Sequence, residues 1–233
     1  MGIFENIDKG NKTSIIKEAK ISGHSEALSL FQIDKITKQM KKSICKIEEN
    51  LIGTGFICLI PNPDITHLLR VLITCNHVLN NLKIGNQLKL IFDNKIERIL
   101  ILDDSRRIYS NEEYDITIIE LKENEFDLND YLKIDDDIFN ANVLDETYKN
   151  KPIYIIHYLK GKEVNFSIDN IINIDKYNLF HCCTTGDGSS GSPILNLNTF
   201  QVIGIHVGKD KNSNCNIGKL IKFSIEDFYI NQL

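Results

Sequence analysis

The sequence predicts an all-β protein of two six-stranded antiparallel β-barrels, preceded by a short helix. Twelve short segments rich in Ile, Val, Leu or Phe, each bounded by Gly, Asn, Asp or Pro, support this prediction. They fall into two sets of six, which is the number of strands that two such barrels require. An acidic stretch over residues 122–151 separates the two sets.

The first set occupies residues 43–121 and the second occupies residues 152–233, which we take as the two barrels. The first-barrel segments are Ser43–Glu48, Gly55–Ile60, Leu69–Thr74, Gln87–Phe92, Ile96–Leu102 and Asp115–Leu121. The second-barrel segments are Ile153–Tyr158, Val164–Ile172, Asn178–Cys182, Pro193–Leu197, Gln201–Val207 and Lys219–Phe223. The last residues, Glu226–Leu233, are expected to form a short helix or a tail.

Residues 1–42 are expected to be an N-terminal extension that is only partly helical. Leu30, Ile33, Ile36 and Met40 recur at helical spacing, which predicts a helix over Ser29–Lys42. The acidic stretch of residues 122–151 has few apolar residues, so we interpret it as a solvated linker with a charged surface.

The composition excludes several classes of protein. The chain has 233 residues, of which 42% are hydrophobic, so it can bury one or two cores and is not disordered. Its net charge of -5 leaves no basic excess, and nucleic acid and membrane surfaces are not expected partners. No apolar run approaches the roughly 18 residues of a membrane span. The first forty residues contain no signal-peptide pattern, which predicts a cytoplasmic location.

The six cysteines are interpreted as reduced core residues, because most lie in apolar runs and their spacing is not that of a disulfide framework. Cys182 and Cys183 stand beside His181, but the chain has no Cys-x-x-Cys pair and three adjacent residues share a tetrahedral site poorly. No metal and no organic cofactor is therefore expected.

The segment Gly186–Pro193, which reads GDGSSGSP, carries the strongest chemical signal. A loop this rich in glycine can fold so tightly that its N–H groups converge, presenting a serine as a nucleophile beside an anion site. His77 follows an apolar run and Asp115 precedes one, which places both at the rim of the first barrel. Taken singly, the serine fits an ordinary turn residue, His77 a hydrogen-bonded core or surface histidine and Asp115 a strand cap. The interpretation therefore rests on the three residues occurring together.

Four segments in this order resemble the trypsin-like serine proteases. They read GTGF from Gly53, ITCNHVL from Ile73, YDITI from Tyr114 and GSSGSP from Gly188. The order His, Asp, Ser is that of the chymotrypsin-type triad. Closest in motif are the disulfide-free members that include glutamyl endopeptidases, and the resemblance covers about Ser43–Phe223. It implies a chymotrypsin-like fold and a serine endopeptidase that cleaves polypeptides through an acyl-enzyme.

The resemblance also implies a role for each residue. Ser190 would be the nucleophile, His77 the general base and Asp115 the group that orients the imidazole. The backbone N–H groups of Gly188 and Ser190 would form the oxyanion hole. A glycine is expected at position 188 because a side chain would obstruct the turn.

Substrate preference is inferred from the segment Val202–Gly208, which follows the nucleophile by a short strand and turn. In glutamyl endopeptidases and picornaviral cysteine proteases, a His in the corresponding segment and a Thr five residues before the nucleophile contact Glu or Gln at P1. His206 and Thr185 hold those positions, and Gly208 would line the same substrate site. Thr184 is neutral where enzymes selective for Lys or Arg carry Asp. Cleavage after Glu or Gln is therefore expected.

Two departures from the family and two alternatives remain. Ser189 replaces the acidic residue that receives a freed N-terminal amine in zymogen-type members, and Val78 replaces a disulfide cysteine.

A catalytically inactive protease fold that serves as a binding module is the main alternative, and an esterase is another. The dinucleotide-like spacing of Gly186, Gly188 and Gly191 is set aside because a strand-like run follows it, not a helix.

Overall fold

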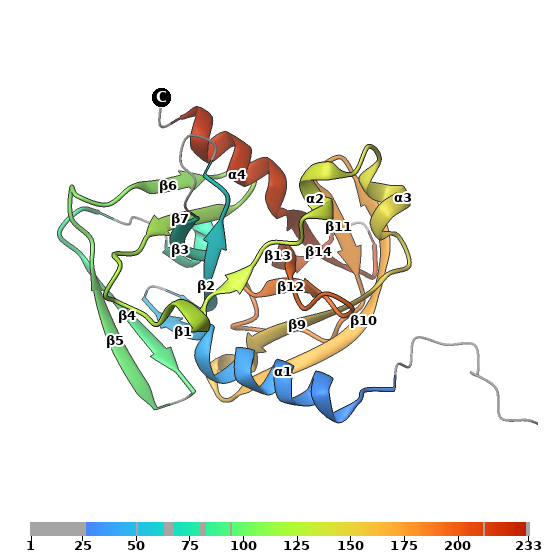
Figure 1. Ribbon diagram of the computed structural model, residues 1–233, viewed down its shortest axis with the longest axis horizontal. Coiled ribbons are helices and arrows are strands. Elements are labelled where there is room, and N and C mark those ends of the chain that lie inside the picture. Colours follow the sequence, from blue (N-terminus) through green and yellow to red (C-terminus); the bar gives the residue numbers. More distant parts are fainter. Residues whose placement is uncertain are drawn as a thin grey trace, which may run out of the picture.

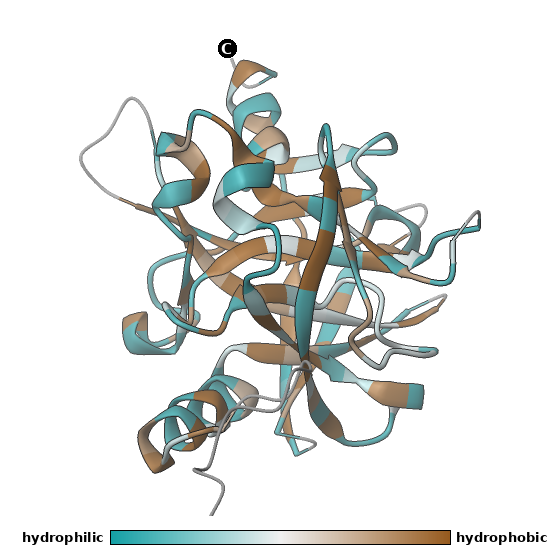
Figure 2. Ribbon diagram, turned by 90° about the vertical axis from the view of Figure 1, so that its right-hand side faces the viewer, coloured by the Kyte–Doolittle hydropathy of each residue, from teal (hydrophilic) through white to brown (hydrophobic). Residues whose placement is uncertain are grey.

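The computed structural model describes residues 27–49, 51–62, 68–79, 83–93, 95–211 and 213–231. Two β-sheets lie side by side, with helices around them (Figure 1). Brown apolar segments lie mainly in the strands, and teal hydrophilic segments lie mainly in the connecting loops (Figure 2). The predicted all-β fold with a short N-terminal helix is confirmed.

The first sheet is open and has eight strands in the part of the chain that the structure describes. Its continuous path runs β5 (Ile96–Ile101), β4 (Gln87–Phe92), β1 (Ile44–Glu48), β2 (Ile52–Ile60), β3 (Leu69–Thr74), β7 (Ile116–Glu120) and β6 (Ile108–Asn111). The eighth strand, β8 (Leu132–Lys133), pairs with β2 in parallel.

This half departs from the predicted six-stranded barrel, because the end strands β5 and β6 each pair with one neighbour among the described strands. Only Leu100 of β5 is buried, and its isoleucines Ile96, Ile99 and Ile101 are exposed, so β5 is an edge strand that does not close the sheet. The sequence pattern does not reveal β6, which carries Ser110 and Asn111, or the two-residue β8.

The second sheet is a closed barrel of six strands, as predicted. Its order is β10 (Val164–Asp175), β11 (Asn178–His181), β14 (Asn216–Leu220), β13 (Val202–Lys209), β12 (Pro193–Asn196) and β9 (Pro152–Tyr158). The last strand ends at Leu220, and helix α4 (Ile221–Ile230) starts at once, so the expected strand over Lys219–Phe223 is corrected. Ile221, Ile225 and Phe228 are buried at helical spacing, which explains why an apolar run there folds as a helix.

Helix α1 (Leu30–Lys42) begins at a capping box formed by Ser29 and Gln32. Of its predicted apolar stripe, Ile36 is buried, whereas Leu30 and Ile33 are exposed. Gln39 holds the helix to the second barrel: its amide donates to the carbonyl of Phe200 at 2.9 Å and accepts from the Tyr154 hydroxyl at 2.5 Å.

The acidic stretch after β7 contains a 3-10 turn, η2 (Leu128–Asp130), then β8 and two short helices, α2 (Asp137–Asn140) and α3 (Leu144–Tyr148). Asp135 departs from the expected charged surface, because only 2% of it is exposed. Its carboxylate accepts from Tyr148 Oη at 3.1 Å, Asn196 Nδ2 at 2.9 Å and Thr199 Oγ1 at 2.7 Å. Asp135 therefore ties this stretch to β12 and to the turn that follows it.

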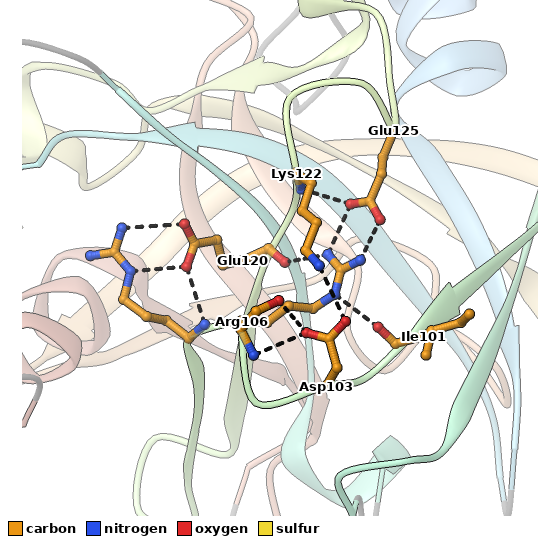
Figure 3. A network of polar contacts seen from close by, with 8 residues as sticks. Ile101, Asp103, Arg106, Glu120, Lys122 and Glu125 are labelled. Carbon is orange, nitrogen blue, oxygen red and sulfur yellow. Dashed lines mark hydrogen bonds and ion pairs between the residues drawn. The ribbon is translucent and has the colours of Figure 1, made fainter.

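A network around Arg106 fixes the beginning of the same stretch (Figure 3). Its guanidinium forms an ion pair with Glu125 and donates to the carbonyls of Ile101 at 2.8 Å and Glu120 at 3.0 Å. Only 3% of the Arg106 side chain is exposed, so its buried charge is compensated by Glu125 and by these two carbonyls.

The cysteines divide into two groups. Cys45, Cys58, Cys75 and Cys183 are buried, whereas Cys182 is exposed and Cys215 is half-buried, so the prediction of core residues holds for four of the six. All six are free thiols. Within the described ranges, no helix combines the length and the apolar character that crossing a membrane requires.

Candidate active site

His77 and Asp115 meet at one end of the first sheet. Strands β3 and β7 are antiparallel neighbours with Thr74 opposite Thr117, so the chain just after β3 lies beside the chain just before β7. His77 lies in the 3-10 turn η1 (Asn76–Leu79), and Asp115 directly precedes Ile116. The expected juxtaposition of these two residues is present.

The Asp115 carboxylate binds His77 through both oxygens. Oδ2 lies 2.6 Å from the ring nitrogen Nδ1, and Oδ1 accepts the backbone N–H of His77 at 3.0 Å. A carboxylate accepts only, so Nδ1 carries the proton and Nε2 is left as an acceptor. The ring is thereby held in one orientation and one tautomer.

The loop after β11 makes a tight turn around Gly188. Ser189 N–H donates to the carbonyl of Gly186 at 3.0 Å, and Gly188 has a φ of 84° in the third position, which is a type II turn. The Asp187 carbonyl accepts from the N–H of Lys160 at 2.5 Å. Because C=O and N–H point in opposite directions in a trans peptide, the Gly188 N–H points away from Lys160.

The N–H groups of the two residues on either side of Ser189 have no acceptor in the described part of the chain. Within the described ranges, neither Gly188 N–H nor Ser190 N–H donates a hydrogen bond. Unpaired backbone donors beside a partly exposed serine form an anion-binding arrangement.

Glycine is required at two positions of the loop. A Cβ at Gly188 would collide with the carbonyl oxygen of Tyr158, and one at Gly191 would collide with that of Thr54. Both glycines also have positive φ, at 84° and 88°, which side chains rarely adopt. The loop can therefore lie directly against both sheets.

Thr54 of β2 connects the first sheet to this loop. Its N–H donates to the Ser190 carbonyl at 2.8 Å, and its hydroxyl donates to the Gly188 carbonyl at 2.7 Å. The same hydroxyl accepts from the N–H of Tyr158 at 3.0 Å, and Thr74 Oγ1 donates to the Thr54 carbonyl at 2.8 Å. Thr54 is fully buried, and sequence reasoning assigned it no role.

Ser189 is held by a buried histidine. Its Oγ lies 2.6 Å from Nδ1 of His157 and accepts the N–H of Gly186 at 3.0 Å. Burial lowers the pKa of His157 to about 4, so the ring is neutral near pH 7. Sequence reasoning gave His157 no role. The one signal in the sequence was Ser189 itself, because a neutral side chain at that position is compatible with a neutral partner.

Ser190 lies beside the His77 segment without a direct bond to it. Its Oγ donates to the Val207 carbonyl at 3.1 Å, and no hydrogen bond in the described part of the chain joins it to His77. The next residue, Gly191, donates its N–H to the His206 carbonyl at 2.9 Å, which also accepts from Cys75 Sγ at 3.4 Å. Cys75 stands two residues before His77, so the two segments are packed together.

The predicted substrate-binding residues lie on two elements. His206 is in β13 and only 2% exposed, and its Nδ1 lies 3.2 Å from Nε2 of His181 in β11. Burial lowers the pKa of both rings, that of His181 to about 4. Gly208 follows a bulge of β13, and half-buried Thr185 lies in the β11–β12 connection. No hydrogen bond among described residues joins Thr185 to His206.

Cys75, His77 and Asp115 place three potential metal-ligand atoms within 4.8 Å of one another. Two of these side chains are already bonded to each other at 2.6 Å. Burial and the Asp115 charge raise the pKa of the Cys75 thiol well above its ordinary value, which disfavours the thiolate that binds metals. The chemistry of the set therefore favours a hydrogen-bonded histidine over a metal centre.

The model of the trypsin-like peptidase domain matches residues 53–205, which is more than half of the chain. The chain belongs to the trypsin-like peptidase family. The prediction of a trypsin-like serine endopeptidase is thus confirmed at the level of the family. A search of curated proteins finds no match for this peptidase.

Solved structures share the fold of this trypsin-like peptidase. The serine endoprotease from Yersinia pestis is 11% identical with a TM-score of 0.62, covering 87% of this chain and 68% of that one. An inactive serine-to-alanine mutant of Rv3671c from M. tuberculosis H37Rv is 15% identical with a TM-score of 0.61, and the match covers 91% of this chain and 98% of that one. The HtrA-type protease AlgW, solved with a tripeptide, is 12% identical with a TM-score of 0.59, and the match covers 84% of this chain and 61% of that one. The predicted chymotrypsin-like fold is therefore confirmed.

The buried histidines predict a specific loss of stability in mild acid. His157 and His181 have folded pKa values of about 4, against 6.5 in the unfolded chain. Between these values the unfolded chain binds protons that the folded chain does not, so the free energy of unfolding falls as pH falls from 6.5 to 4. We expect a loss on the order of 2–3 kcal/mol per histidine over this window. Urea denaturation at pH 7.0, 6.0 and 5.0 measures it.

His157→Gln is the control for this measurement, because glutamine can still bond Ser189 and does not titrate. Its stability should fall less steeply between pH 7 and 5 than that of the wild-type chain. Equal stability of the wild-type peptidase at pH 7 and pH 5 would contradict the assignment of neutral buried rings.

Proposed function

We propose that this peptidase is catalytically active, with Ser190 as nucleophile, His77 as general base and Asp115 as the residue that orients His77. The observation that carries the proposal is the joint presence of an oriented imidazole and two unpaired N–H groups on the adjacent loop. The Nδ1–Oδ2 distance of 2.6 Å orients the imidazole. The type II turn at Gly188 leaves the N–H groups available.

The proposed reaction begins with a rotation of the Ser190 side chain. Its hydroxyl leaves the Val207 carbonyl and turns to Nε2 of His77, which removes the proton as Oγ attacks the scissile carbonyl carbon. The carbonyl oxygen becomes an oxyanion that accepts from the N–H groups of Gly188 and Ser190. His77 then gives its proton to the leaving amine, and the acyl-enzyme forms. His77 then deprotonates a water molecule, which attacks the acyl carbon. The bond between that carbon and Ser190 Oγ breaks, Oγ takes the proton back from His77, and the acid is released.

The tautomer of the histidine pair supports a preference for Glu or Gln at P1. Nδ1 of His181 is buried and has no partner within the described ranges. An unpaired buried N–H is rarer than an unpaired acceptor, so His181 donates from Nε2 to Nδ1 of His206. His206 then carries its proton on Nε2, where it can donate to a side-chain carboxylate or amide oxygen. Thr185 would supply a second donor, and Gly208 leaves open space beside the site.

One observation favours the alternative of an inactive binding module. Ser190 Oγ is bonded to Val207 and not to His77. We give it less weight because catalytic hydrogen bonds are often formed only when substrate is bound. An esterase would use the same residues and is separated by its turnover of ester and peptide substrates.

The six free thiols fit a reducing compartment, and we infer a cytoplasmic location from them. The proposed substrate is a polypeptide, and the mechanism requires neither a metal nor an organic cofactor.

Covalent labelling tests the nucleophile. A fluorophosphonate should label Ser190 of the wild-type peptidase, because an oriented imidazole and an oxyanion site activate its hydroxyl. Ser190→Ala should not be labelled and should lose roughly 10⁴–10⁶-fold in peptide turnover. Mass spectrometry of the labelled peptide identifies the site, and Ser192→Ala is the matched control. A folded wild-type chain that stays unlabelled would support the binding module.

Thr54 is predicted to position the oxyanion loop. Thr54→Val keeps the shape but removes the hydroxyl that bonds Gly188 and Tyr158, so the labelling rate of Ser190 should fall by about 10–100-fold. Thr54→Ser retains the hydroxyl and should keep most of the rate. Both variants are compared below their melting temperatures. Equal rates in the Val and Ser variants would show that the hydroxyl does not position the loop.

A peptide library that varies P1 tests the substrate preference. We expect substrates with Glu or Gln at P1 to exceed those with Leu, Lys or Arg by about a hundredfold in kcat/KM. The reason is that Nε2 of His206 is a donor that a side-chain carboxylate or amide oxygen can accept from. Thr185→Val should lower kcat/KM for Glu substrates, whereas Thr184→Val, at the exposed neighbouring position, should not. A preference for Lys, Arg or Leu would contradict the assignment.

A further inference from the structure

A cavity of about 830 Å³ lies between α1, the end of β2, the η2–β8 segment and the turn after β12. This volume is within the range of sites for small organic molecules. The cavity is lined in part by Lys35, Lys38, Arg70 and Lys133. It is separate from the proposed catalytic residues: Thr54 contacts the nucleophile loop, whereas Leu59 lines the cavity, and five residues of extended strand span roughly 17 Å.

The charge of this cavity is opposite to that of the whole chain. The chain has a net charge of -5, yet four of the cavity's lining residues are cationic and none of the described ones is acidic. Arg70 has an ion pair with Glu123, but 84% of the Glu123 side chain is exposed, so this pair is weak. Lys35, Lys38 and Lys133 form no ion pair within the described ranges. The cations are therefore available to a ligand.

Two residues that line the cavity carry buried donors without partners in the described part of the chain. Tyr131 is only 7% exposed, and its hydroxyl makes no hydrogen bond within the described ranges. The Nε atom of Arg70 is likewise buried and unpaired there. Leaving such a group unpaired is unfavourable for folding, so buried unpaired donors mark positions where a partner is missing. An anion is the one class of ligand that accepts from both and also neutralises the surrounding lysines.

We propose that this cavity binds a small organic anion that carries two or more phosphate or carboxylate groups. Arg70 and Tyr131 would donate to one anionic group at the buried end after side-chain rotations, because Arg70 Nε and the Tyr131 hydroxyl are not solvent-accessible in the ligand-free chain. Lys35 and Lys38 on α1 and Lys133 on β8 would bind the second group at the mouth. The ligand would thus join α1 to the first sheet, and it would stabilise the folded chain by mass action.

Calorimetric titration of the full chain with pyrophosphate and with citrate tests the proposal, at constant ionic strength. Saturable binding and a raised melting temperature are expected with at least one of them. Binding of pyrophosphate alone assigns a phosphate ligand, and binding of citrate alone assigns a carboxylate ligand. Binding of both assigns a general polyanion site. Absence of binding of either at millimolar concentration overturns the proposal.

Variants locate the binding. Arg70→Gln and Lys38→Gln should each weaken it at least about tenfold, and Lys38 is exposed, so its replacement leaves the fold intact. Lys95→Gln, at the exposed β4–β5 turn, is the matched control and should bind as the wild-type chain does. If Lys95→Gln weakens binding as much as Lys38→Gln, the attraction is general and the site is refuted.

Tyr131→Phe should affect the stability of the ligand-free chain and its affinity for the anion in opposite directions. The substitution removes a buried hydroxyl that has no partner, so the ligand-free chain should melt at the same temperature or higher. The same substitution should weaken anion binding severalfold, because one donor is lost. A lower melting temperature without ligand, or unchanged binding, would contradict the assignment of this hydroxyl to the ligand.

Discussion

The contact between Thr54 and the Gly186–Ser192 loop is the constraint on which the site depends. One residue of the first sheet binds the carbonyls of both Gly188 and Ser190. On the other side of the loop, Lys160 holds the carbonyl of Asp187. The Asp187 carbonyl shares a trans peptide with the Gly188 N–H, so its bond to Lys160 leaves that N–H facing the opposite way. The Ser190 N–H shares its peptide with the Ser189 carbonyl, which accepts from Ser192 within the loop. The arrangement of the two N–H groups therefore depends on the turn itself and on the contacts that hold it between the sheets.

Buried histidines with lowered pKa values form polar contacts inside the second barrel. His157 bonds Ser189, and His181 bonds His206. Burial keeps these rings uncharged near pH 7, so each contributes hydrogen bonds without the free-energy cost of a buried charge. The Ser189 hydroxyl thus has a neutral partner within the barrel, His157.

Charge is distributed unevenly over the peptidase. The acidic stretch after β7 supplies Glu125 to the Arg106 network and Asp135 to a buried polar cluster, so it is anchored at two points. Between these points, η2 and β8 form a wall of the cationic cavity. The segment read as a solvated linker thus joins the two sheets and shapes a second concave site away from the nucleophile loop.

Local sequence patterns determined the strand content, the closed second barrel, helix α1 and the meeting of His77 with Asp115, because alternation, turn residues and strand ends are properties of short segments. The open first sheet, with strands β6 and β8, was decided by tertiary pairing that leaves no local signature. The same holds for Thr54, His157 and Asp135. Their hydrogen bonds join residues 134, 32 and 61 positions apart, and only the folded chain brings such partners within reach.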